Sequence, residues 1–229
     1  IKQRTVFGAD SPNEHFDGDL VLLNGGAKAG PVDLKAFAYF LDYDTRLAFS
    51  SQTFGLLAKG SVPLGRAKLN LVGSYASQSD MGGNPVSYSA DYLNAEAGLS
   101  IAGFGLTAGY ELLGSDNGTA AFQTPLATLH AFNGWADMFL TTPAGGIQDF
   151  YVTASKALTE VEAIPGLRVA VTYHSFDSDF GGIDYGIEWN ALLGFKIGPV
   201  GVLAKYAKYS ADLFGVDTEK FWLQAEISF

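Results

Sequence analysis

Apolar and polar residues alternate strictly toward the C-terminal part of the chain. Counting back from the last residue, every second position is apolar: Phe229, Ile227, Ala225, Leu223 and Phe221. Four of the five residues at the positions between them are polar. Strict alternation is typical of a β-strand with one apolar face and one polar face. The sequence therefore predicts a strand over 218–229 that ends on an aromatic side chain.

The same alternation recurs along the whole chain, with turn residues between the alternating segments. It predicts a strand fragment at 1–6 and eleven full strands, at 19–28, 33–43, 51–60, 67–78, 90–101, 104–114, 149–157, 167–176, 186–197, 200–209 and 218–229. These strands run about 9–12 residues, which is the length that a tilted strand needs to cross a lipid bilayer.

The connections between these segments alternate in length. Short turns are expected at 29–32, 62–66, 102–103 and 198–199, and longer connections rich in Asp, Gly and Ser at 7–18, 44–50, 79–89, 115–148, 177–185 and 210–217. A strand meander with short turns at one end and long loops at the other is typical of outer-membrane barrels. We therefore expect the long loops outside the cell and the short turns in the periplasm.

The two faces of the predicted strands differ in their chemistry. One face is continuously apolar, as at Leu93, Ala95 and Ala97, whereas the other is small, neutral and polar with scattered charge. A soluble β-sandwich or lipocalin-like barrel also alternates, but its outer face usually carries more charge. The pattern predicts an all-β fold: a transmembrane antiparallel β-barrel, built as an up-and-down meander of about 12 strands in a single domain, 1–229.

Residues on the polar face are expected to line the lumen of this barrel. A charge on the lipid face would cost roughly 2–4 kcal/mol at the bilayer midplane, so charged side chains belong inside. By strand phase, eight of them are predicted to line the pore: Lys59, Lys68, Glu96, Glu111, Arg168, Glu188, Lys205 and Glu226.

The composition supports a membrane protein. Only 17% of the residues are charged, against about 25% in a typical soluble domain. No apolar run approaches the roughly 20 residues of a transmembrane helix, so a closed barrel is the remaining way to cross a membrane with the backbone satisfied. The net charge of −10 argues against nucleic acid as a partner. The bacterial outer membrane is the expected location.

The sequence lacks the common motifs of catalysis and metal binding. It has no Cys, no GxSxG or HExxH motif, and three His, at His15, His130 and His174. The acidic run 177–184 has the composition of a calcium loop but lacks the terminal Glu of an EF-hand, so a solvated turn is expected. We expect no catalytic residues, no metal site and no cofactor.

The long connection 115–148 carries the most specific motif. It reads FQTPLATLHAFNGWADMFLTTPAGG at 122–146, where Leu126, Leu129 and Phe132 have helical spacing. This run resembles a segment of the alginate-export family of outer-membrane porins, and the resemblance extends to 109–111, 173–176, 184–189 and the C-terminal strand. It implies a single-chain barrel of roughly eighteen strands. This chain would be its C-terminal portion, lacking N-terminal strands, or a smaller relative. The arginine-rich pore of that family is not matched, since the chain has four Arg.

The sequence therefore predicts an outer-membrane porin or export channel for the passive passage of polar or anionic solutes, such as acidic oligosaccharides. The long connection is expected to fold into or over the pore, because its apolar residues would otherwise face water. His130, Trp135 and Asp137 would then lie near the constriction. The expected partners are the lipid bilayer, lipopolysaccharide and, through Phe229, the barrel-assembly machinery. Two alternatives are a membrane-embedded enzyme with a His-centred polar cluster and a structural or adhesive barrel with a plugged lumen.

Overall fold

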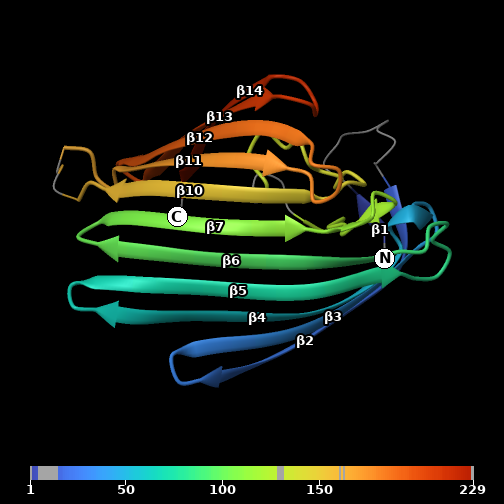
Figure 1. Ribbon diagram of the computed structural model, residues 1–229. Helices are drawn as coiled ribbons and strands as arrows, with labels where there is room; N and C mark the ends of the chain where they lie inside the picture. The colour runs from blue at the N-terminus through green and yellow to red at the C-terminus, as the bar shows by residue number, and fades with distance from the viewer. Residues whose placement is uncertain (1, 5–14, 128–131, 160, 162, 228–229) are drawn as a thin grey trace.

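The computed structural model describes residues 2–4, 15–127, 132–159, 161 and 163–227. Its main element is a 12-stranded antiparallel sheet in the order β1-β2-β3-β4-β5-β6-β7-β10-β11-β12-β13-β14. Figure 1 shows these strands side by side in one curved sheet. Consecutive long strands are therefore neighbours, which is the meander that the alternating segments predict.

Every strand predicted from alternation has a counterpart in the sheet. A small hairpin of β8 and β9 lies in the long connection, and the short 3-10 helix η1 (Leu47–Phe49) precedes β4. The antiparallel all-β fold is thereby confirmed. The strand bounds are β1 Lys2–Arg4, β2 His15–Ala29, β3 Val32–Tyr43, β4 Ser51–Leu64, β5 Ala67–Asp80, β6 Ser89–Ile101, β7 Phe104–Leu113, β8 Ser115–Asp116, β9 Ala120–Ala121, β10 Ile147–Ala157, β11 Arg168–Asp177, β12 Asp184–Ile197, β13 Val200–Ala211 and β14 Thr218–Ile227.

Some strands run further than alternation predicts, because backbone pairing continues to a tight turn. β4 does not end at residue 60 but continues to Leu64, which lies opposite Ala67. Only Gly65 and Arg66 then form the turn, and Gly65 has a φ of 61°, a left-handed conformation that glycine adopts without steric penalty. The turn predicted at 62–66 is therefore shorter than expected.

Exposed apolar side chains cover one face of the sheet, which we call the outer face. They recur at every second position of the long strands, and Leu56 on β4, for example, is 64% exposed. An apolar band of this extent is unfavourable in water and is the surface that lipid covers in transmembrane barrels. The band includes Val21, Leu23, Leu34, Phe54, Leu56, Leu71, Leu93, Leu99, Leu106, Phe150, Val169, Val171, Trp189, Leu193, Phe221 and Leu223.

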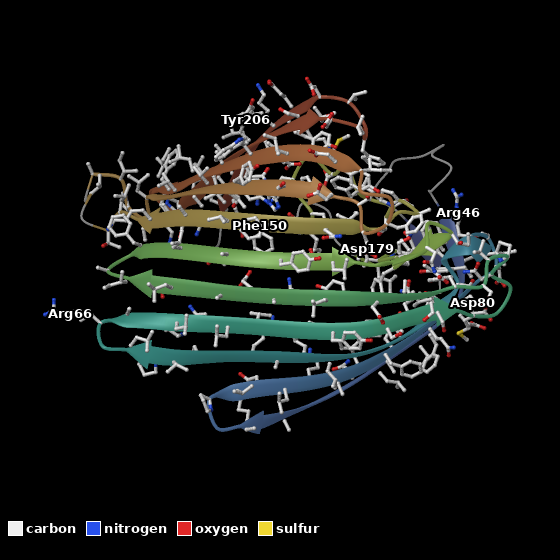
Figure 2. All side chains as sticks on the ribbon, viewed as in Figure 1. Arg46, Arg66, Asp80, Phe150, Asp179 and Tyr206 are labelled. Atoms are coloured by element: carbon white, nitrogen blue, oxygen red, sulfur yellow. The ribbon has the colours of Figure 1, made fainter. Side chains whose placement is uncertain are left out.

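The two ends of the meander differ as expected. Figure 2 shows Arg66 at the end with the short turns, and Arg46, Asp80 and Asp179 at the opposite end. Within the described residues, no helix is long and apolar enough to cross a membrane.

The described sheet is open, since β1 and β14 stand at the two ends of the strand order. Closure into a barrel, the size of that barrel and the single-domain organisation stay predictions. Phe229 lies outside the described residues, so its expected role in barrel assembly also stays a prediction.

Candidate functional site

The inner face of the sheet is the face on which the long connection packs. Residues that lie directly opposite each other on neighbouring strands share a face. One such row crosses the sheet from β4 to β13, and six of its eight residues have polar or charged side chains. It consists of Lys59, Val72, Glu96, Gly109, Tyr151, His174, Glu188 and Tyr209.

By strand register, the eight charged residues predicted to line the pore lie on the inner face. Glu111 and Glu188 are buried beneath the long connection, at 6% and 0% exposure. Their carboxylates contact protein groups, which is a different environment from the expected open lumen. The pore-lining role of the set stays a prediction. Of the other six, two are half-buried, Glu96 and Lys205. The remaining four are exposed: Lys59, Lys68, Arg168 and Glu226.

The long connection runs from residue 114 to residue 146 and is tied to the wall through Gln123. The Gln123 backbone N–H donates to Gln78 Oε1 at 2.8 Å, and Gln78 Nε2 donates to the Gln123 carbonyl at 3.0 Å. The Gln123 side chain also bonds the backbone of Thr142, at 2.9 and 3.1 Å, which joins the two halves of the connection. The Tyr88 hydroxyl also donates to Gln78 Oε1. Burial raises the pKa of Tyr88 to about 12, so this hydroxyl stays protonated and can serve as the donor.

The helical spacing of Leu126 and Phe132 does not produce a helix in the described residues on either side, 115–127 and 132–146. The third residue of that pattern, Leu129, lies outside the described residues, as does His130 of the expected constriction. Three residues just beyond have left-handed φ angles, which a right-handed helix cannot contain. They are Asn133 at 51°, Gly134 at 83° and Asp137 at 56°.

Phe139 anchors the second half of the connection by apolar packing. Its ring is 8% exposed and lies 4.8 Å from the ring of Phe176 on β11 and 5.2 Å from Phe214, which follows β13. Tyr185 and Tyr209 complete the same cluster, with ring centroids 5.8 and 6.1 Å away. Aromatic pairs at these separations contribute about 0.5–1.5 kcal/mol each beyond the area they bury.

The backbone at Trp135 and Ala136 is held by a buried carboxylate. Glu188 Oε1 on β12 accepts the backbone N–H groups of Trp135 and Ala136, at 2.5 and 2.9 Å. Hydrogen bonds to an ionised acceptor are stronger than those between neutral groups. Glu188 therefore fixes the middle of the connection on the inner wall.

Two further contacts hold the same segment at its ends. Asn133 Nδ2 donates to Glu111 Oε2 on β7 at 3.1 Å. Asp137 Oδ2 accepts from Lys220 Nζ on β14 at 2.9 Å. Residues 133–137 thus lie across the inner face between β7 and β14.

Trp135 packs against a lysine of the wall. Lys205 Nζ lies 5.1 Å from the Trp135 ring centre and 5.4 Å from that of Trp222 on β14. A cation within about 6 Å of an indole face is attracted to it, by about 0.5–2 kcal/mol. Of the three residues expected at the constriction, Trp135 and Asp137 are therefore placed together on the inner wall.

A cavity of about 890 Å³ lies between the inner face and the long connection. Lys59 lines it and forms no ion pair with any described residue. The carboxylates that line the cavity all have hydrogen-bond partners. Glu96 accepts from the Tyr151 hydroxyl at 2.7 Å, Glu111 from the Tyr92 hydroxyl at 2.6 Å, and Asp149 lies 3.0 Å from His174 Nδ1.

His174 and Asp149 are the nearest approach to the His-centred cluster that an enzyme would need. Both Asp149 oxygens lie 3.0 Å from His174 Nδ1, and both residues are buried. In the part of the chain that the structure describes, no hydroxyl bonds the other ring nitrogen, and no group of three or more His, Cys, Asp or Glu could hold a metal ion. The alternation along β11 puts His174 on the inner face, opposite Tyr151 and Glu188, but no sequence pattern signals its pairing with Asp149.

No family model and no curated protein matches the sequence, but solved structures match the fold. Acinetobacter baumannii OccAB4 has a TM-score of 0.71 at 15% identity, over 96% of this chain and 55% of that chain. The Pseudomonas aeruginosa outer membrane protein OpdK has a TM-score of 0.66 at 13% identity, over 93% and 56%. P. aeruginosa OccK2 (OpdF), in complex with glucuronate, has a TM-score of 0.62 at 14% identity, over 93% and 59%.

These neighbours are outer-membrane porins, which are channels rather than enzymes. The chain therefore has the fold of an outer-membrane β-barrel porin, in agreement with the predicted outer-membrane location. It spans a little over half the length of the solved structures it matches. The comparisons do not single out the alginate-export family.

Proposed function

We propose that this chain forms part of the wall of a passive outer-membrane channel, with the long connection as its constriction. The observation that carries the proposal is the contrast between the faces of the sheet. The outer face is an exposed apolar band, and the inner face lines a cavity of about 890 Å³ that the long connection partly covers. A wall that suits lipid outside and water inside is the wall of a channel. Further strands, to roughly eighteen in all, would close it.

The solute class follows from the charges that the inner face leaves unpaired. Lys59, Lys68 and Arg168 form no ion pair with any described residue, and neither does Glu226 on the same face. The three carboxylates of the cavity, Glu96, Glu111 and Asp149, keep their charge but have hydrogen-bond partners within the protein, so the unpaired charges of the inner face are mainly cations. Unpaired cations along a pore favour anionic solutes. OccK2 was solved with glucuronate, a sugar acid. We extend that class to this chain and propose acidic sugars and short acidic oligosaccharides, of which uronates are the simplest.

Planar-bilayer recording of the purified protein tests this function. We expect discrete channels with anion preference, and a reduction of current by glucuronate but not by glucose. The triple variant K59Q/K68Q/R168Q should lose the anion preference. K208Q is the matched control, because Lys208 forms an exposed pair with Glu219 on the outer face and should leave selectivity unchanged. A folded protein without conductance would reject the channel and favour the plugged barrel, which the contacts of 133–137 across the inner face also fit.

A further inference from the structure

Glu188 is a buried carboxylate that the channel itself does not require. A charge that lines a pore must reach the solute, yet Glu188 is 0% exposed. In the described part of the chain it forms no ion pair, and its cross-strand neighbours are His174 on β11 and Tyr209 on β13. The groups that donate to it are backbone amides of the long connection.

The backbone at 133–136 is shaped to receive an anion. Asn133 and Gly134 have left-handed φ angles of 51° and 83°. The two N–H groups that follow, of Trp135 and Ala136, then point to one oxygen, Glu188 Oε1. Successive N–H groups in such a turn form a concave nest that binds anions. Asn and Gly are the residues that adopt this conformation most readily.

Gly134 is also required by the close approach of the carboxylate. A Cβ atom added at Gly134 would lie 2.4 Å from Glu188 Oε2. A methyl group at this position would therefore force the Glu188 carboxylate to move away from the two N–H groups, and the left-handed φ would strain the substituted backbone. The glycine and the glutamate form a matched pair, although they come from the long connection and from β12.

We propose that residues 133–136 are a carboxylate-binding nest, that Glu188 is its resident ligand, and that this contact positions the constriction. The ligand class is a small carboxylate, because the nest supplies two N–H donors to one oxygen and no cation. The inference rests on the proposed channel only where it concerns the constriction. The nest itself can be tested without conductance.

Chemical rescue of E188A tests the nest. Acetate replaces the group that this substitution removes, and acetamide is its neutral equivalent. The long connection has no Lys or Arg between 115 and 148, so chymotrypsin reports its release from the wall while trypsin serves as a control. Loss of two charge-assisted hydrogen bonds should make chymotryptic cleavage about tenfold faster or more. Acetate should slow the cleavage of E188A again and return its single-channel conductance to the wild-type value. Acetamide should do neither.

G134A is the matched control, because it blocks the nest while leaving Glu188 in place. It should be cleaved faster and should not respond to acetate. If E188A fails to fold, E188Q takes its place; it should be cleaved faster without rescue, since its amide still fills the site. Unchanged cleavage in a folded E188A or E188Q, or equal rescue of E188A by acetamide, would overturn the proposal. A wild-type protein that conducts no current would reject the channel but leave the proteolysis result standing.

Discussion

Lys220 and Asp137 form an ion pair that joins the long connection to β14. Lys220 Nζ lies 2.9 Å from Asp137 Oδ2, across 83 positions of sequence. The Asp137 side chain is 9% exposed and that of Lys220 is 36% exposed, so water screens the pair only in part. The pair holds one end of a segment whose other end is bound to Glu111 through Asn133.

A double-mutant cycle should show that this pair contributes to stability. With D137N, K220Q and the double variant, we expect a coupling of about 1 kcal/mol in the free energy of unfolding, above most of the 0.2–1 kcal/mol range of exposed pairs. Urea titration in lipid vesicles measures it. Lys208 and Glu219, 3.4 Å apart and 52% and 59% exposed, are the control pair and should give a coupling near zero. Equal couplings in the two cycles would contradict the role of partial burial.

Adjacent residues of β4 should differ in how much a charge destabilises the protein. Leu56 is 64% exposed on the outer face, whereas Leu57 lines the inner cavity. L56K should destabilise the folded protein in a bilayer by about 2–4 kcal/mol, because lysine enters hydrocarbon. L57K should fold with a smaller loss, since its side chain reaches water in the lumen. The free energies of unfolding of both variants in lipid vesicles test the assignment of faces, and a larger loss for L57K would reverse it.

The two ends of the meander should differ in accessibility on intact cells. Leu213 is 72% exposed in the connection after β13, and Arg66 lies in the tight turn after β4. A membrane-impermeant maleimide should label L213C on whole cells and R66C only after the outer membrane is opened. Labelling of R66C but not L213C would invert the proposed topology.

Shortening the long connection should widen the channel. Replacing 120–145 with a short Gly-Ser linker removes the contacts of Gln123, Phe139 and 133–137 with the inner wall. We expect a higher single-channel conductance and weaker anion preference in a variant that still folds. Unchanged conductance and selectivity would show that this connection is not the constriction.

The strands could be predicted because each is encoded locally. On β12, Trp189 and Leu193 face outward while Glu188 and Asn190 face inward, and a period of two assigns all four positions from the sequence. Turn residues predicted the strand ends to within a few positions. Errors such as the end of β4 arose where backbone pairing with the next strand continues beyond the predicted strand.

The contacts of the candidate site could not be predicted in the same way. Glu188 has the strand phase expected of a pore-lining charge. It is instead bound by backbone amides 52 and 53 positions earlier in the sequence, and no residue near Glu188 in the sequence indicates that contact. Glu111 and Asn133 are similarly 22 positions apart. The Asn133-Gly134 pair is a local signal for left-handed backbone, whereas the spacing of the preceding apolar residues, such as Leu126 and Phe132, suits a helix. Side-chain pairing across a folded-in connection depends on tertiary packing, which periodicity does not encode.

The placement of the three tryptophans gives this protein two separate optical reporters. Trp189 is 49% exposed on the outer face beside Tyr173, with ring centres 5.0 Å apart. Trp135 and Trp222 flank Lys205 on the other face. Brominated lipid should therefore quench Trp189, and aqueous iodide the indole pair around the lysine. Emission from one chain can thus report membrane insertion and movement of the long connection as independent events.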